Sequence, residues 1–122
     1  MSNDLLNKKC VPCEGGVPPL SHEEIAGLMG EVSGWNLSEE SNPNLNKTGM
    51  GAKISKEYKF KDFIGAINFV NNIAELAESE GHHPDIKINY NKVTLELSTH
   101  AVGGLSENDF ILAAKIDANR VT

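Results

Sequence analysis

The feature that most constrains the fold is an amphipathic segment over about residues 61–79 that ends abruptly. Its apolar side chains recur at the spacing of one helix face, at Phe63, Ile67, Val70, Ala74 and Ala77. Gly81 favours the left-handed conformation that ends helices, and Pro84 keeps the helix from resuming. The pattern predicts one long helix that packs by one face against a core.

A hairpin pattern follows this helix. Apolar side chains alternate over residues 86–90 and again over 93–97, with a tight turn expected at Asn91-Lys92. Such alternation is typical of antiparallel strands that turn one face toward a core. We therefore expect two paired strands after the helix.

Two further helices are predicted from their capping residues. Ser21 and Glu24 form a capping box that predicts a helix over about 21–31. Ser106 can cap a last helix, with Asp109 at its third position. The apolar residues of the last helix wrap most of its circumference, which indicates that it is deeply buried or covered by another subunit.

Two more strands are expected between the first and second helices. One begins near Gly34 to Leu37 and the other covers about 52–60, with a polar loop over 39–49 between them. The order helix, two strands, helix, two strands, helix (αββαββα) predicts an α+β fold. We expect a four-stranded antiparallel sheet with three helices packed on one face.

The bulk composition bounds the class of protein. A chain of 122 residues is one domain of ordinary size. The net charge of -6 and the single arginine, Arg120, disfavour nucleic acid and anionic membrane surfaces. No apolar run is long enough for a membrane span, and the polar start does not resemble a signal peptide, so a cytoplasmic location is the expectation.

Residues 1–20 are expected to form an irregular N-terminal arm, with the domain covering 21–122, because proline and glycine are frequent before Ser21. The arm holds the only two cysteines, Cys10 and Cys13, as a C-x-x-C pair. No second pair completes a zinc site, and no strand and helix flank the motif. A solvated or loosely packed thiol pair is therefore the expectation, with metal or redox use as alternatives.

Three of the four histidines, His82, His83 and His100, lie in one short window at the ends of predicted elements. Imidazole exchanges protons near neutral pH, so the group suits proton transfer on a small molecule. Three histidines also make a common zinc set. Adjacent histidines followed by Pro84 do not easily converge on one ion, which disfavours the metal interpretation.

The neighbouring polar residues each have a simpler interpretation. Glu78 is placed to meet His82 at the helix end, but it could also be a solvated charge. Asp109 is explained by helix capping alone, and Tyr90 by a place in the core. Solvation, capping and core packing therefore compete with a catalytic interpretation at these three positions, and a surface or core role remains an alternative for the histidines.

Taken together, the pattern Glu78-x3-His82-His83-Pro84-x5-Tyr90-x9-His100-x8-Asp109 resembles the signature of the pterin-4a-carbinolamine dehydratases. Trp35 after Gly34 and the leader Cys-Val-Pro-Cys-Glu-Gly-Gly are also similar to members of this family. The resemblance implies the same three-helix, four-stranded fold. It further implies a homodimer or homotetramer.

The resemblance implies that 4a-hydroxytetrahydropterin loses water to give quinonoid dihydropterin, with no metal or organic cofactor. It implies that His82 and His100 are the acid/base pair and that His83, also a catalytic residue, positions the pterin ring or assists proton transfer. It assigns Asp109 to orienting a histidine and Glu78 to a place beside His82, with Pro84 and Tyr90 as further signature positions. The alternative is a partner-binding protein, such as an assembly factor or a dimerisation cofactor, that has the same fold.

Overall fold

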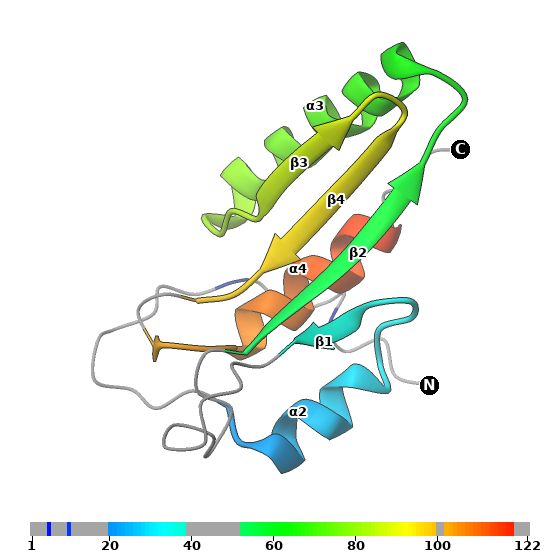
Figure 1. Ribbon diagram of the computed structural model, residues 1–122. Coiled ribbons are helices and arrows are strands. Elements are labelled where there is room, and N and C mark those ends of the chain that lie inside the picture. Colours follow the sequence, from blue (N-terminus) through cyan, green and yellow to red (C-terminus); the bar gives the residue numbers. More distant parts are fainter. Residues whose placement is uncertain (1–4, 6–9, 11–19, 39–51, 100–101, 119–122) are drawn as a thin grey trace.

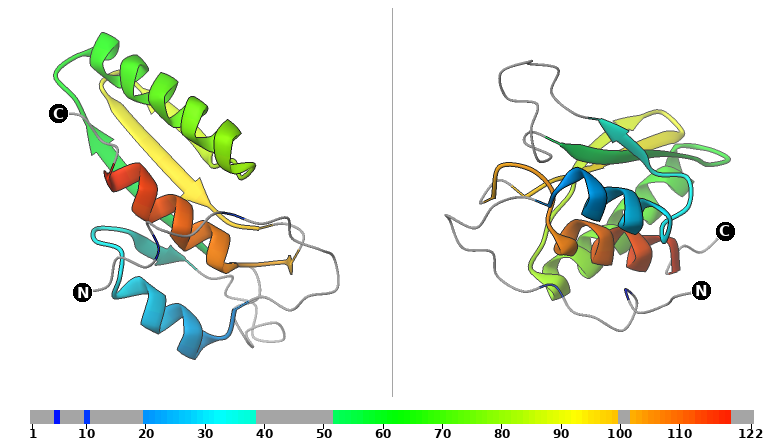
Figure 2. Two further views of the ribbon diagram at one scale, coloured as in Figure 1. Left: turned by 180° about the vertical axis from the view of Figure 1, so that it is seen from behind. Right: turned by 90° about the horizontal axis from the view of Figure 1, so that it is seen from below.

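A four-stranded antiparallel sheet covered on one face by three helices forms the part of the chain that the structure describes. This computed structural model describes residues 5, 10, 20–38, 52–99 and 102–118. The elements, labelled as in Figure 1, are α2 (His22–Met29), β1 (Asn36–Ser38), β2 (Lys53–Lys59), α3 (Phe63–Glu80), β3 (Asp85–Asn89), β4 (Lys92–Leu97) and α4 (Glu107–Ala118). The right-hand view of Figure 2 shows that all three helices lie on the same face of the sheet. The predicted α+β fold and its element order are confirmed.

The sheet has the strand order β1-β2-β4-β3, and every neighbouring pair is antiparallel. The pairing of β1 with β2 confirms the first hairpin, whose predicted loop over 39–49 lies outside the described residues. In β4 the alternating residues Val93, Leu95 and Leu97 are fully buried, as expected. The strand β3 is different, because it lies at the edge of the sheet.

The edge position of β3 leaves its apolar side chains half covered. Ile86 pairs with Leu95 and Ile88 with Val93, so these isoleucines lie on the helix-bearing face of the sheet. They nevertheless remain 38% and 39% exposed. The expectation that both strands of this hairpin pack fully on the core is correct for β4 and only partly correct for β3.

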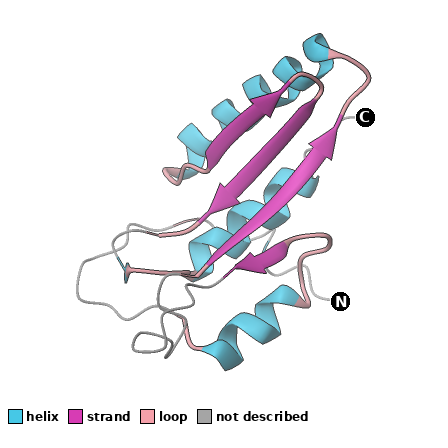
Figure 3. Cartoon of the chain, viewed as in Figure 1, coloured by secondary structure: helices cyan, strands magenta, loops and turns pink. Residues whose placement is uncertain are grey.

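The hairpin turn lies one residue earlier than predicted. Tyr90 and Asn91 form it, and Lys92 is already the first residue of β4. Figure 3 shows the short loop that joins these two strands. Tyr90 has a positive φ of 56° and is 64% exposed, so its interpretation as a core aromatic is wrong. The Asn91 side chain stabilises the turn by donating to the Phe60 carbonyl over 2.9 Å.

The helix ends follow the capping chemistry of the sequence. Ser21 and Glu24 form the predicted capping box of α2. Asp62 caps α3 by accepting a hydrogen bond from the Gly65 amide. At the other end of α3, Gly81 is left-handed with φ 71°, and the amides of Gly81 and His82 both donate to the Ala77 carbonyl.

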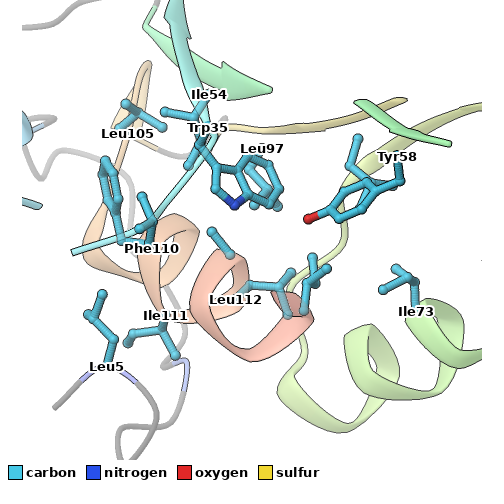
Figure 4. Packing of buried hydrophobic residues seen from close by; sticks show 14 of the residues in the cluster. Leu5, Trp35, Ile54, Tyr58, Ile73, Leu97, Leu105, Phe110, Ile111 and Leu112 are labelled. Carbon is cyan, nitrogen blue, oxygen red and sulfur yellow. The ribbon is translucent and has the colours of Figure 1, made fainter. Parts of the chain in front are cut away.

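The core lies between the sheet and the helices (Figure 4). Tyr58 and Phe69 pack with ring centroids 4.7 Å apart and join β2 to α3. The helix α4 is buried on most sides, at Asn108 to Ala113 and at Ile116, so the deep burial predicted for it is confirmed within one chain. Among the described residues, none of the helices is both long and apolar enough to span a membrane.

A partly buried polar cluster closes the far end of α4. The Asp117 carboxylate accepts hydrogen bonds from Trp35 Nε1 at 3.0 Å, Lys56 Nζ at 3.0 Å and Tyr58 OH at 2.7 Å. These bonds join α4 to β2 and to the segment before β1. Trp35, expected near the first strand, thus packs in the core while its indole N–H keeps a partner.

Candidate active site

The ends of three elements meet on one side of the molecule. The last residues of α3, the end of β4 and the first turn of α4 gather there (Figure 1). His82 follows the left-handed cap of α3, and Asp109 lies in the first turn of α4. His82 Nε2 and Asp109 Oδ1 are 2.6 Å apart. Two residues far apart in sequence therefore form a direct hydrogen bond.

The Asp109 carboxylate is fully buried and fully bonded. Its Oδ2 accepts hydrogen bonds from Thr99 Oγ1 at 2.7 Å and from the Ser106 amide at 2.9 Å. The Thr99 hydroxyl is also 2.8 Å from that of Ser106. Because Thr99 gives its own proton to Asp109, it accepts from Ser106. An ionised carboxylate is tolerated in such a place because each oxygen has donors.

Asp109 therefore both caps α4 and holds His82. Its position three residues after Ser106 is the predicted capping position, and the bond to the Ser106 amide confirms the cap. An ionised carboxylate can only accept, so the proton of this hydrogen bond belongs to His82 Nε2. That assignment leaves Nδ1 as the ring nitrogen that can exchange a proton with a ligand.

The second histidine of the adjacent pair has different surroundings. His83 Nε2 lies 3.4 Å from Glu78 Oε2, and both side chains are exposed. The two imidazoles thus face separate environments, as expected for an extended pair before Pro84. The expected contact of Glu78 with His82 is replaced by this contact with His83. The reason is the left-handed cap at Gly81, which turns His82 away from α3 and toward α4.

Two of the remaining signature positions, Tyr90 and His100, are not placed beside His82 and Asp109 by the described structure. Tyr90 lies at the opposite end of β3 from Pro84, about 20 Å away along an extended strand. His100 lies outside the described residues, and so does Ala101. The preceding residue, Thr99, is described and is hydrogen bonded to Asp109. No group of three potential metal ligands is found among the described residues, a set that leaves out His100.

Thr99 and Ser106 were not singled out as site residues by the sequence, apart from the capping role of Ser106. Thr99 forms an isolated bridge with Gly104, and its amide donates to the Gly104 carbonyl over 2.7 Å. This bridge and the hydrogen bond to Asp109 fix the position of Thr99. A hydroxyl residue directly before His100 was the only signal for it in the sequence.

Cys10 is packed rather than solvated, which corrects the expectation of a loosely packed thiol pair. It is buried with Leu5 against the core, and its amide donates to Glu80 Oε1 over 2.9 Å. Its Sγ lies 3.6 Å from the Asn108 carbonyl. Burial, the negative charge of Glu80 and a hydrogen bond to it raise the pKa of the Cys10 thiol to about 12. Cys13 lies outside the described residues.

We expect Cys10 to be unreactive in the folded protein. A pKa raised from 9.0 to about 12 lowers the thiolate fraction near pH 8 about 1,000-fold, and burial adds a steric barrier. In a Cys13→Ser background, iodoacetamide should alkylate Cys10 at least about 10³-fold more slowly in buffer than in urea. Similar rates in the two solutions, followed by mass spectrometry, would show that Cys10 is not held as described.

The fold and the site define a class: a small α+β domain that holds a histidine on a buried carboxylate where a helix, a strand and a second helix meet. Residues 18–119 match the family model described as pterin 4 alpha carbinolamine dehydratase. The chain is 50% identical over 115 residues to a Nitrosospira multiformis protein named "Putative pterin-4-alpha-carbinolamine dehydratase", covering 94% of this chain and 91% of that relative. A Rickettsia bellii protein of the same name is 47% identical over 114 residues, covering 93% and 91%.

Two solved structures are also similar. One, described as a transcriptional coactivator/pterin dehydratase from Brucella melitensis, has 30% identity and a TM-score of 0.67, covering 82% of this chain and 96% of that one. The other, described as a pterin dehydratase-like RuBisCO assembly factor of the alpha-carboxysome, has 21% identity and a TM-score of 0.53, covering 69% and 86%, and supports the fold alone. The chain belongs to the pterin 4 alpha carbinolamine dehydratase family.

Proposed function

We propose that this protein is a 4a-hydroxytetrahydrobiopterin dehydratase, which removes water from the 4a-carbinolamine to give quinonoid dihydropterin in tetrahydropterin recycling. Membership of the family supports the reaction. The observation that carries the mechanism is His82, whose ring is fixed by the buried Asp109 carboxylate at 2.6 Å. A histidine held in this way is suited to general acid–base catalysis.

The chemistry requires an acid and a base on different sides of a small bicyclic ring. The C4a–O bond breaks as the oxygen gains a proton and leaves as water. The N5 lone pair forms the new double bond to C4a, and a ring N–H proton is lost to a base. One histidine that gives a proton and one that takes it therefore balance the reaction.

We assign this acid/base pair to His82 and His100, as the family signature implies. His82 Nδ1 is free to exchange a proton because Nε2 is engaged by Asp109. Thr99, the residue before His100, donates a hydrogen bond to the same carboxylate. His83, beside Glu78 on the exposed side, is assigned to positioning the pterin ring. The proposed chemistry draws on side chains alone, without metal or organic cofactor.

The direct test is to mix purified protein with chemically generated carbinolamine and follow the absorbance. We expect the dehydration to be accelerated in proportion to protein concentration, and equally after treatment with a chelator. Absence of acceleration would refute the dehydratase proposal. It would leave the alternative function, a partner-binding or assembly protein of the same fold, as the better one.

Exposed apolar side chains favour self-association, and we propose a homodimer or homotetramer. Among the described residues the large ones are Leu37, Phe63, Ile64, Ile86, Ile88 and Tyr90. Ile86 and Ile88 lie on β3, which has no neighbouring strand on its outer side within the described part of the chain. The cytoplasmic location stays a prediction.

The charged variant Ile86→Lys/Ile88→Lys should shift the protein to a smaller species in size-exclusion chromatography with light scattering. Two ammonium groups oppose burial of this strand against another chain. Glu57→Lys is the matched control, since Glu57 is exposed on the opposite face of the sheet, next to the inward-facing Tyr58. An unchanged mass of the double variant would place the contact elsewhere.

A further inference from the structure

A second polar cluster lies behind the His82–Asp109 pair, centred on Glu80. This last residue of α3 has a carboxylate whose side chain is only 6% exposed. Its Oε1 accepts a hydrogen bond from the Cys10 amide at 2.9 Å, and its Oε2 lies 2.7 Å from Lys115 Nζ on α4. One carboxylate thereby joins the N-terminal arm, α3 and α4.

Both partners of the site are directly linked to this cluster. Glu80 precedes His82 by two residues, separated from it only by the left-handed Gly81. Cys10, bonded to Glu80, places its thiol 3.6 Å from the carbonyl of Asn108, the residue before Asp109. Lys115 lies on α4 about 9 Å along the helix axis from Asp109. The cluster therefore fixes the end of α3 relative to the start of α4.

The geometry of the pair depends on that relative position. The bond of 2.6 Å between His82 and Asp109 crosses from the end of α3 to α4. A shift of even half an ångström between the two segments would lengthen it beyond a strong charge-assisted hydrogen bond. The Lys115–Glu80 ion pair is a polar contact that joins the two helices themselves, whereas His82 lies beyond the end of α3.

We propose that Glu80 is a positioning residue for the His82–Asp109 pair, and that the N-terminal arm takes part through Cys10. The inference rests on the dehydratase function proposed above for its effect on rate. Its geometric content, that Glu80 controls the hydrogen bond between His82 and Asp109, stands independently of the reaction. Glu80 itself does not touch the substrate in this proposal.

The test compares Glu80→Gln with two controls. Glutamine keeps the shape of Glu80 and removes the charge that pairs with Lys115. Glu75→Gln makes the same chemical change at an exposed position on the same helix. Asp117→Asn breaks a partly buried ion pair at the other end of α4, and therefore reports what a loss of stability alone does.

The first measurement is the ¹⁵N NMR spectrum of the histidine rings, which does not depend on activity. We expect the Nε2–H signal of His82 to shift or to be lost in Glu80→Gln and to stay in place in both controls. Alkylation of Cys10 should become faster in Glu80→Gln alone. An unchanged His82 signal in a folded Glu80→Gln protein would overturn the proposal, whatever the wild-type activity.

The second measurement is steady-state kinetics. If the wild type is a dehydratase, Glu80→Gln should lower kcat about 10-fold, with KM changed less than about 2-fold, because misplacement of a catalytic group mainly affects the chemical step. Asp117→Asn should retain kcat at temperatures where it is folded. Equal kcat losses in Glu80→Gln and Asp117→Asn would overturn the proposal and indicate a structural role.

Lys115 provides a second route if Glu80→Gln fails to fold. Lys115→Met keeps the aliphatic stem and removes the charge, and should produce the same His82 shift as Glu80→Gln. Lys115→Arg keeps the charge and should restore the wild-type spectrum and kcat. A His82 signal that is identical in Lys115→Met and the wild type would contradict the proposed role of the cluster.

Discussion

Replacing His82 by glutamine is expected to lower kcat of carbinolamine dehydration by about 10²-fold to 10⁴-fold. The amide group of glutamine can still donate to Asp109, so the buried carboxylate keeps a partner. It cannot exchange a proton at neutral pH. Stopped-flow measurement of the carbinolamine decay should therefore show a large loss of rate in a protein of nearly wild-type thermal stability.

His82→Ala is the informative companion to that variant. It removes the same proton exchange but also leaves one Asp109 oxygen without its donor, which costs about 3–5 kcal/mol for a buried charge. We expect equal rate losses in the two variants and a lower Tm only in His82→Ala. A dehydration rate near that of the wild type in either variant would refute the assignment of His82 as acid or base.

Replacing Asp109 by asparagine is expected to lower both kcat and stability. The carboxylate accepts from His82 on one oxygen and from Thr99 and the Ser106 amide on the other, so an asparagine must turn its NH₂ group either toward His82 or toward the other two donors. If the NH₂ group faces His82, the imidazole must change tautomer and its Nδ1 becomes protonated. We expect kcat to fall about 10²-fold or more and stability to fall by about 1–3 kcal/mol.

Thr99→Ala separates these two effects. It removes one hydrogen bond to Asp109 but leaves the carboxylate and its bond to His82 in place. We expect a loss of stability of about 1 kcal/mol with a much smaller loss of kcat than in Asp109→Asn. The fraction of folded Asp109→Asn protein under assay conditions is measured by urea titration. If the folded variant retained wild-type kcat, a purely structural role of Asp109 as a helix cap would be the better account.

The fold was predictable because its signals are local. The apolar spacing before Gly81 specifies α3, and the capping box at Ser21 and Glu24 specifies the start of α2. The position of Asp109 in the first turn of α4 also followed from the spacing to Ser106. Each of these signals lies within one continuous stretch of sequence, so no knowledge of the tertiary structure was needed.

The pairing within the site was not predictable from the same signals. A spacing of four residues favours contact between Glu78 and His82 on a continuing helix, yet the left-handed Gly81 ends that helix first. Which of two adjacent histidines then meets Asp109 depends on how α3 and α4 pack. The exposure of β3 similarly depends on strand order, which places it at the edge of the sheet.

The contacts made by the N-terminal arm could not be predicted from the sequence either, because they also depend on tertiary packing. Cys10 meets Glu80 across 70 residues of sequence, and no periodicity connects them. The proline and glycine residues after Cys10 led to the expectation of an irregular arm, yet Cys10 is packed against the core and Leu5 is helical. Glu80 was indistinguishable in the sequence from the solvated acids beside it, because only its tertiary position buries it.

The left-handed cap at Gly81 has a consequence for how this domain can change its length. The 18 residues of α3 run from the Asp62 cap directly to the turn that delivers His82. One residue inserted or deleted within α3 would rotate the helix end by about 100° and translate it by about 1.5 Å. His82 would then point away from Asp109 even though neither residue had been altered. Insertions and deletions should thus be excluded from α3, because the length of this helix sets where His82 lies relative to Asp109.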